Sequence, residues 1–534
     1  MSHKMDLAFC PGMHTPADQG KTLALYRQLG ASSVQLYIDW KEVEKTPGVF
    51  EWSSYDQEVE NLRAYDLKMG PFLIIGPWYV TPQFVRDEPG MVMYRCVEHH
   101  RDSAIPSLWC PNIRQHVRRF MRAFADHFLA EDILQFVILG ISGDYGEGLY
   151  PVVGNGPGAY HGHPGHWCAD PLAVADLQRW LRSQYNGSIQ ELNRAWKTRY
   201  GAFEDVLPFI RRDAPSERAY LELIRWYRQS MTDYCDFWMR TTAEIFPGIP
   251  AYLCTGGLML PEHGADFSAQ VRVASRTGAG VRVTNEYSDY CTNFMQTRLV
   301  NSAGRGYGAF TSHEPAATVT PAGVAGRIFN AVSGGCSQLF SYPGAYIDST
   351  PAIHEGGEVF KRYRRLLVQR KPVVPVAVFY PDADRVLRSA VSLDRFPLAL
   401  RRVVDFDLVD ENMIQDELLD RYTFLIVADA PVMQAGTLER IDSWVKKGGV
   451  LFNVNCMVAD IEGKEDVWRN LNGFTPQTDR HYGITSQQIL KPDLLPRYTQ
   501  AQPHFATLPN STIGGYQPSP TPTKGRGEWF LTSV

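Results

Sequence analysis

The chain has 534 residues, of which 44% are hydrophobic and 12% aromatic, which describes a globular protein of two or three domains. Its formal net charge is −5 at pH 7 and it contains no basic stripe, which argues against nucleic acid as a partner. There is no apolar segment at its start and no uncharged apolar run long enough to span a membrane, so we expect neither secretion nor membrane insertion.

The nine cysteines are scattered along the chain, are odd in number, and form no CxxC pair. Reduced thiols explain this pattern better than a disulfide framework does. We therefore expect a cytoplasmic protein.

From the N-terminus, short apolar strands alternate with amphipathic helices, which is typical of βα units and a parallel sheet. Because eight such units close most economically into a barrel without sheet edges, we predict a (β/α)8 TIM barrel over residues 1–370. The predicted strands are residues 7–10, 34–38, 71–75, 133–139, 250–254, 280–284, 308–311 and 338–341. Predicted helices include residues 20–29, 55–65, 112–129 and 322–332.

An insertion of about 148–248 follows the fourth predicted strand. It begins with a loop rich in Gly, His and Pro and continues with helical stretches at 173–185 and 219–246. A long excursion at the catalytic end of a barrel is normally a lid that shapes the substrate site.

A second, smaller α/β domain is predicted over residues 371–476. Its strands, 376–380, 424–427 and 450–453, alternate with helices at 396–404 and 437–447. It has no GxGxxG and no P-loop, so we expect no nucleotide site and no cofactor. The remainder, 477–534, is rich in Pro, Thr and Gly, and we interpret it as an irregular segment with a terminal strand at 529–532.

Carboxylates follow two of the predicted barrel strands. The apolar run that ends at Leu139 breaks at Gly140 and is followed by Asp144 and Glu147, and Glu314 follows the seventh strand. Residues in these positions lie where a β/α barrel builds its active site. Glycoside hydrolysis needs one protonated carboxylic acid and one ionised carboxylate, and Glu147 and Glu314 would be that pair. An acid at a strand end is more often a helix cap or a salt bridge, but two of them beside Gly, Pro and aromatic residues favour catalysis.

Other residues after strand ends are candidate substrate contacts. Glu286 is a rival nucleophile for which binding of a substrate hydroxyl is the preferred role, and Asp144 is assigned to substrate as well. Core packing is the alternative for each aromatic residue, and a surface salt bridge for Arg101. The further candidates are Trp40, Trp78, Tyr79, Trp167, Tyr287, His313, Tyr342 and Arg101.

Several segments resemble glycoside hydrolase family 42, the bacterial β-galactosidases. They are DWKEVEKTPGVFEWSSYD at 39–56, LQRWLRSQYNGSIQELNRAWKTRYGAFEDVLP at 177–208 and HEPAATVTPAGVAGRIFNAVSGGCSQLFSYPG at 313–344. The domain from Pro375 resembles the trimer-forming, flavodoxin-like domain of that family. The resemblance covers roughly residues 5–460.

The resemblance implies an exo-acting retaining β-glycosidase, a glycoside hydrolase of the β-galactosidase type that forms a homotrimer, with Glu314 as nucleophile. The family carries Asn-Glu after the fourth strand, whereas this chain has Gly143-Asp144-Tyr145-Gly146-Glu147. A strict register places Asp144 as the acid. We prefer Glu147 as general acid/base because its side chain is longer and because GEGLYP resembles the acid segment of the β-amylases.

The missing Asn leaves the sugar open. A β-mannosidase, β-glucosidase, α-L-arabinopyranosidase or inverting β-amylase-like hydrolase is an alternative, and so is an inactive carbohydrate-binding barrel.

We expect no metal site. Many family members carry a cysteine cluster near the third strand and the insertion, and we count only Cys110 and Cys168 as counterparts, too few for a site built of Cys alone. His161, His163 and His166 have ligand-like spacing, yet a Gly/Pro-rich loop without an acidic partner favours a plain loop.

Overall fold

The structure, a computed structural model, describes residues 5–10, 19–143, 145–151, 161–257, 260–284, 290–314, 320–341, 358–388, 395–401, 403–454, 456 and 458–472. The chain divides into two compact units, Met1–Pro372 and Val373–Val534, which we treat separately.

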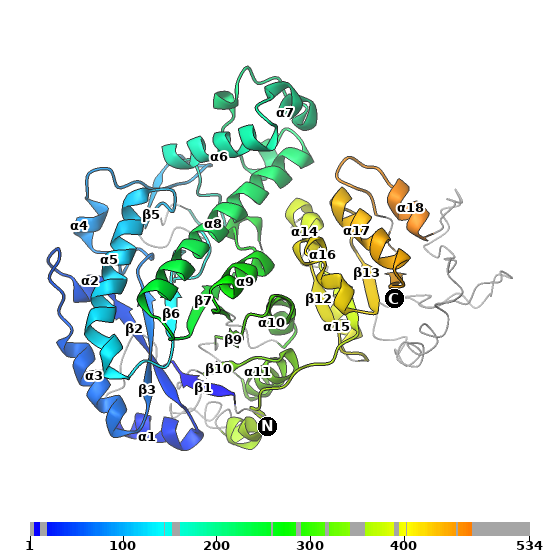
Figure 1. The fold of residues 1–534 in the computed structure, drawn as a ribbon. Coiled ribbons are helices and arrows are strands. Elements are labelled where there is room, and N and C mark those ends of the chain that lie inside the picture. Colours follow the sequence, from blue (N-terminus) through cyan, green and yellow to red (C-terminus); the bar gives the residue numbers. More distant parts are fainter. Residues whose placement is uncertain are drawn as a thin grey trace. The chain divides into compact units, whose positions relative to one another are not determined.

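The first unit is built on a closed barrel of eight parallel strands (Figure 1). All eight predicted strands are present, and the prediction of a TIM barrel is confirmed. Around the barrel the strand order is β1-β10-β9-β8-β7-β6-β3-β2. The strands are β1 (Asp6–Phe9), β2 (Ser33–Asp39), β3 (Lys68–Ile74), β6 (Val137–Gly140), β7 (Ala251–Thr255), β8 (Gly280–Val283), β9 (Thr311–His313) and β10 (Gln338–Ser341).

Helices surround the barrel and bury one apolar face each. In α5 (Pro111–Phe128) the buried residues recur at helical spacing, as in Val117, Phe120, Phe124 and Phe128. The other helices in the described part of this unit include α1 (Gln19–Leu29), α2 (Trp40–Val43), α3 (Ser53–Ala64), α4 (Gln83–Arg86), α6 (Pro171–Gln184), α7 (Ile189–Trp196), α8 (Glu217–Ile245), α9 (Phe267–Arg276), α10 (Tyr290–Tyr307) and α11 (Pro321–Gly334). Helices α6, α7 and α8 lie within the stretch of about 148–248 that the sequence analysis assigns to the insertion.

A short antiparallel hairpin of β4 (Met93–Arg95) and β5 (Asp102–Pro106) follows the third barrel strand. The sequence did not predict it. A three-residue strand whose pairing is irregular between Met93 and Arg95 carries too little alternation to be recognised.

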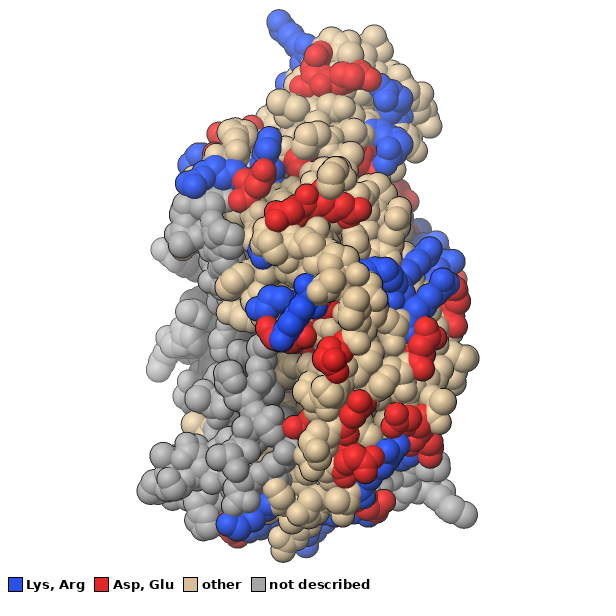
Figure 2. Space-filling model, turned by 90° about the vertical axis from the view of Figure 1, so that its left-hand side faces the viewer, with Lys and Arg blue, Asp and Glu red and all other residues tan. Residues whose placement is uncertain are grey.

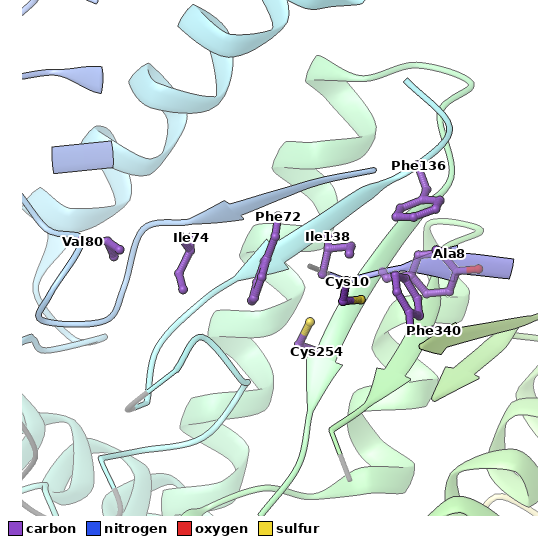
Figure 3. Close-up of a cluster of buried hydrophobic side chains, with 10 residues drawn as sticks. Ala8, Cys10, Phe72, Ile74, Val80, Phe136, Ile138, Cys254 and Phe340 are labelled. Carbon is purple, nitrogen blue, oxygen red and sulfur yellow. The ribbon is translucent and has the colours of Figure 1, made fainter. Parts of the chain in front are cut away.

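The interior of the barrel is filled by side chains at alternate strand positions (Figure 3). Phe136 and Ile138 come from the β6 segment, and Tyr252 and Cys254 from β7. The rest of the cluster is Ala8, Cys10, Phe72, Ile74, Val80 and Phe340. Continuing the same alternation toward the carboxyl ends of the strands leads to Gly140, Gly256, Thr284 and Glu314. The period of two therefore places one carboxylate, one hydroxyl and two glycines at the end of the barrel where a site is expected.

The second unit is a four-stranded parallel sheet covered by helices. Its order is β12-β11-β13-β14, the beginning of a flavodoxin-like order. A smaller α/β domain after the barrel is confirmed, although the strand β12 was not predicted. The elements are β11 (Val376–Phe379), α14 (Asp382–Arg388), α15 (Arg395–Leu400), β12 (Asp407–Val409), α16 (Glu411–Gln415), β13 (Phe424–Ala428), α17 (Ala435–Lys446), β14 (Val450–Val454) and α18 (Asp466–Asn472). The predicted strand at 529–532 lies outside the described residues.

Basic and acidic side chains are interspersed over the described part of the face in Figure 2, and they form no continuous basic area there. Within the described residues, no helix is both long enough and apolar enough to cross a membrane.

Candidate active site

Glu314 lies directly after β9 and is almost fully buried, with 5% of its surface exposed. Its backbone amide donates to the carbonyl of Val283 on the neighbouring strand. The Thr284 hydroxyl donates to one carboxylate oxygen at 2.6 Å, and the Arg282 guanidinium lies 3.3 Å from the other. Both oxygens are thus held by fixed groups of β8 and its end, which defines one orientation of the carboxylate.

Arg282 is a buried cation inside the barrel. Its guanidinium donates to Gln35 Oε1 at 2.6 Å, across the barrel on β2. It also lies 5.0 Å from the ring centres of both Phe72 and Phe340. A buried charge needs a partner and favourable contacts to offset its desolvation. Glu314, Gln35 and the two rings supply these contacts. Arg282 and Glu314 are therefore a buried ion pair in which each charge offsets the other.

The loop that carries Glu147 folds back over the barrel. Ile141 N donates to Gly146 O, Gly148 N donates to Cys254 O, both at 2.8 Å, and Gln270 Nε2 donates to Gly148 O at 2.6 Å. These bonds fix the segment on both sides of Glu147 to the end of β7 and to α9.

Glycine is required at two positions of this loop because neighbouring atoms leave no room for a side chain. A Cβ at Gly146, whose φ is +111°, would lie 3.0 Å from Gly140 Cα and from Phe72 Cζ. A Cβ at Gly148 would lie 2.9 Å from Cys235 Sγ. The spacing G-x-x-G-E-G therefore reflects a loop that is pressed against the barrel mouth.

Glu147 and Thr284, which donates to Glu314, both lie close to Gly256, which follows β7. A Cβ at Gly256 would lie 3.4 Å from Glu147 Cγ and 2.8 Å from Thr284 Cβ, and Thr284 is the residue bonded to Glu314. The charges of Glu147 and Glu314 both act on the thiol of Cys254. Burial raises its pKa to about 12, the Arg282 charge opposes the rise, and the charges of Glu314 and Glu147 add to it. Glu147 and Glu314 are therefore both near Cys254 and Gly256, at the carboxyl end of the barrel.

Aromatic side chains stand beside Glu147. Burial, and after it the charge of Glu147, raises the pKa of the Tyr79 hydroxyl. Tyr79 is half-buried, and the indole of Trp78 packs edge-on against it with ring centres 5.7 Å apart. Tyr145 is 61% exposed. These residues retain surface on which a sugar could stack.

Four predicted substrate contacts, namely Trp40, His313, Arg101 and Trp167, have other surroundings. Trp40 is fully buried, donates to Glu44 at 2.7 Å and packs against Phe120, so it belongs to the packing of α2 against α5. His313 is also fully buried, and its ring contacts Asn301 and Cys336 behind Glu314. Burial lowers the pKa of His313 to about 3, so this imidazole is neutral.

Arg101 is exposed beside β5, where its backbone carbonyl accepts from Cys96 N. Trp167 is fully buried as well. Asp144, Glu286, Tyr287 and Tyr342 lie outside the described residues.

Arg282, Thr284 and Gln35 were not anticipated from the sequence. A signal was present, because an arginine inside the run Gly-Val-Arg-Val of a buried strand needs an internal partner.

A second group of polar side chains lies beside the β4–β5 hairpin. One ligand atom each of Cys96, His99 and His161 lies within 4.8 Å of the others, and Glu98, His99 and His163 form an overlapping set. A thiolate with two imidazoles is a donor set suited to zinc-class ions.

A closed (β/α)8 barrel followed by a smaller parallel α/β unit is an architecture shared with barrel glycoside hydrolases. No family model and no curated protein matches the sequence. Among solved structures, a catalytic mutant of Gan42B, a GH42 β-galactosidase from G. stearothermophilus, matches with 12% identity over 90% of this chain and 76% of that chain, with a TM-score of 0.66.

Two other matches carry different activities. The catalytic domain of a β-amylase from Paenibacillus polymyxa is 14% identical over 68% of this chain and 98% of that chain, with a TM-score of 0.58. An exo-carrageenase of GH42 from Bacteroides ovatus is 12% identical over 86% and 66% of the two chains, also with a TM-score of 0.58. At these identities the likeness establishes the fold, which is the fold of the GH42 enzymes.

Proposed function

We propose that the protein is an exo-acting retaining β-glycosidase of the β-galactosidase type, related to glycoside hydrolase family 42. The observation that supports this proposal is that Glu147 and Thr284, the hydrogen-bond donor to Glu314, both lie close to Gly256 at the carboxyl end of the barrel. Two carboxylates at the carboxyl end of a barrel are what glycoside hydrolysis requires.

In this mechanism Glu314 attacks the anomeric carbon while Glu147 donates a proton to the leaving oxygen. The C–O bond to the leaving group breaks and a glycosyl ester forms on Glu314. Glu147 then removes a proton from water, which attacks the anomeric carbon and releases the sugar with its original configuration. Arg282 and Thr284 hold the Glu314 carboxylate in one orientation before attack and stabilise its negative charge again after hydrolysis.

This mechanism sets a distance for the carboxyl groups. A retaining pair stands about 5–5.5 Å apart, whereas an inverting pair opens to about 6.5–9.5 Å to admit a water. We expect the shorter separation between Glu147 and Glu314 in a complex with substrate.

The β-amylase match supports a second candidate. The match covers 98% of that catalytic domain, which is compatible with an inverting hydrolase on the same fold. The exo-carrageenase match extends the range of sugars to be tested beyond galactosides, mannosides, glucosides and arabinopyranosides.

We further propose that the protein is cytoplasmic, as its scattered cysteines suggest, and homotrimeric, as the resemblance of its second domain implies. Light scattering of the purified chain should give three times the mass of one 60.3 kDa chain. A monomeric mass at micromolar concentration would contradict the trimer.

A panel of aryl β-glycosides tests the reaction. We expect release of the phenol from at least one glycoside. Glu147→Gln should lose about 10²–10⁴-fold in rate on substrates with poor leaving groups and much less on dinitrophenyl substrates, which need no protonation. The matched control is Glu262→Gln, a partly buried acid after β7, which should retain activity. No cleavage of any member, with sugar binding intact, would favour the inactive carbohydrate-binding barrel.

A further inference from the structure

The alternation of strand β2 places a third carboxylate at the carboxyl end of the barrel. Gln35 points inward, because its side chain accepts a hydrogen bond from Arg282 across the barrel. Tyr37 also points inward and packs against the interior cluster, with its ring centre 5.2 Å from that of Phe72. Asp39 is the next residue with this period of two, and its backbone is still extended, with φ −77° and ψ 106°. Its side chain is therefore directed into the candidate site.

Asp39 lies near the segment that carries the proposed acid. It pairs with Ile74, and Ile74 pairs with Gly140, so these three residues form one layer at the strand ends. The loop of Glu147 packs on Gly140. The charge of Asp39 also raises the pKa of the Tyr79 hydroxyl, after the larger effects of burial and of Glu147. Asp39 and Glu147 thus act on one hydroxyl group.

One oxygen of Asp39 is available to a ligand. Its Oδ1 accepts from Lys41 N at 3.0 Å, which caps the short helix α2. Within the part of the chain that the structure describes, Oδ2 has no hydrogen-bond partner. The side chain is half-buried, and burial raises its pKa while the charge of the exposed Lys41 lowers it. A carboxylate oxygen in this setting can accept a hydrogen bond from a sugar hydroxyl.

The sequence around the carboxyl end of the barrel supplies little positive charge. Six of the barrel strands are followed by segments that contain no Lys or Arg, and each of these segments contains at least one Asp or Glu. They are residues 10–18, 141–170, 256–266, 284–289, 314–320 and 342–357. The buried Arg282 is already bound to Glu314 and Gln35. An anionic group on a substrate normally needs a Lys or Arg partner, which these segments do not provide.

Cations do follow the other two strands, β2 and β3. They are Lys41, Lys45, Arg86, Arg95 and Arg101. None of them is buried, and two pair with acids of their own segment, Lys45 with Glu42 at 3.2 Å and Arg95 with Asp102 at 2.6 Å.

We propose that Asp39 binds a hydroxyl group of the terminal sugar and makes the site selective for sugars that carry no negative charge. This inference rests on the glycosidase function proposed above. The hydroxyl donates to Oδ2, while Lys41 N keeps Oδ1 in place. Uronic acids and sugar sulfates are excluded, because an anionic group beside Asp39 is repelled and finds no cation to bind.

Two pairs of substrates test this selectivity. They are nitrophenyl β-galactoside with nitrophenyl β-galacturonide, and nitrophenyl β-glucoside with nitrophenyl β-glucuronide. The members of each pair differ only in a CH₂OH or a carboxylate on the sugar ring. For whichever neutral member the wild type cleaves, kcat/KM of the uronide should be lower by about 100-fold or more, because like charges are brought together.

Asp39→Asn assigns the selectivity to this residue, because Asn has nearly the same volume and still caps a helix. The ratio of kcat/KM between the neutral and the anionic member should fall by about tenfold or more. Asp39→Ser also retains a capping side chain and should shift the ratio in the same direction. The matched control is Asp170→Asn. Asp170 caps α6, but both of its oxygens accept from groups of the protein, so the ratio should remain that of the wild type.

Equal kcat/KM values within a pair, or a ratio that is unchanged in Asp39→Asn and Asp39→Ser, would overturn this inference while the glycosidase function stands. If the wild type cleaves none of the four compounds, the glycosidase function fails, and calorimetric binding of the same compounds decides the present inference. A neutral member should then bind and its uronide should not. Equal affinity for the two, or no binding of either, would overturn the inference.

Discussion

The two units each bury a glutamate, and the two carboxylates are held in different ways. Glu411 begins α16 and is 3% exposed, and Glu314 is 5% exposed. The oxygens of Glu411 accept from neutral donors, namely the amides of Ala383 and Gln434 and the hydroxyl of Thr437. Burial raises its pKa to about 6. Glu411 thus ties three segments of the second unit together.

Glu314 has a cationic partner, Arg282, and a second carboxylate in its neighbourhood, Glu147. The comparison teaches that burial and hydrogen bonding do not distinguish a catalytic acid from a structural one. What sets Glu314 apart, and makes it the candidate nucleophile, is a charged partner at the carboxyl end of the barrel and a second carboxylate in the neighbourhood.

The largest expected effect is a contrast between two glutamate substitutions. One should remove activity without lowering stability, and the other should lower stability without removing activity. Glu314→Gln should lower the rate on the order of 10⁴-fold or more, because the nucleophile is lost, and leave the thermal midpoint nearly unchanged. Glu411→Gln should keep its activity but lose about 1–3 kcal/mol of stability, because an amide NH₂ then faces a donor. Kinetics and thermal unfolding of both variants check this. Activity that depends on Glu411 rather than Glu314 would break the comparison.

Removal of the Arg282 guanidinium should lower both stability and activity. Arg282→Met leaves Glu314 buried without its charged partner, so we expect a loss of about 3–5 kcal/mol in stability and a lower kcat. The matched control is Arg298→Met, a buried arginine of α10 that donates to Ser333. It should lose stability with little change in kcat. A double-mutant cycle of Arg282→Met with Glu314→Gln measures the coupling, which should be non-zero because the groups touch.

The pH dependence of stability sharpens the same contrast in the second unit. The folded-state pKa of Glu411 is raised to about 6 from an ordinary value of 4.5. The folded state then binds the proton more tightly, so the stabilisation is present below pH 4.5 and is lost as the pH rises through 6.

The difference in unfolding free energy between wild type and Glu411→Gln should therefore shrink by about 2 kcal/mol from pH 4.5 to 7. Hydrogen exchange of amides in β11 and β13 localises the measurement to this unit. If the difference in unfolding free energy does not change with pH, the hydrogen bonds to the Glu411 carboxylate offset the effect of burial on its pKa.

The smallest expected effect comes from loss of the Thr284 hydroxyl, which donates a hydrogen bond to Glu314. Thr284→Val removes one hydrogen bond to a charged group, so kcat/KM should fall by about 10–100-fold without loss of fold. Thr284→Ser keeps the hydroxyl and should recover most of the activity. Equal activities in the two variants would mean that this bond does not orient the nucleophile.

The barrel strands could be predicted because each is an apolar run between breakers, but their ends were less well defined. β6 was expected from residue 133 and begins at Val137, since the apolar residues before it make only an isolated bridge, Met69–Leu134. The seventh strand was expected from Gly308, which instead takes φ +81° after α10. The strand then covers Thr311–His313.

The two acids of the candidate site were found from their positions after strands, whereas the groups that hold them were not. Arg282 and Gln35 meet only because the barrel closes, and no local pattern encodes that contact. His161 and Cys96 are likewise joined by pairing between two distant segments. Trp40 was mistaken for a binding residue because a strand end does not reveal whether the helix beyond it covers the side chain.

Trapping the glycosyl-enzyme tests the central claim most directly. The enzyme is incubated with the 2-deoxy-2-fluoro derivative of whichever glycoside it cleaves, digested, and mapped by mass spectrometry. We predict one sugar adduct per chain, on the peptide that contains Glu314 and at that residue. An adduct on Glu286, or turnover with inverted product and no adduct on any residue, would contradict the account.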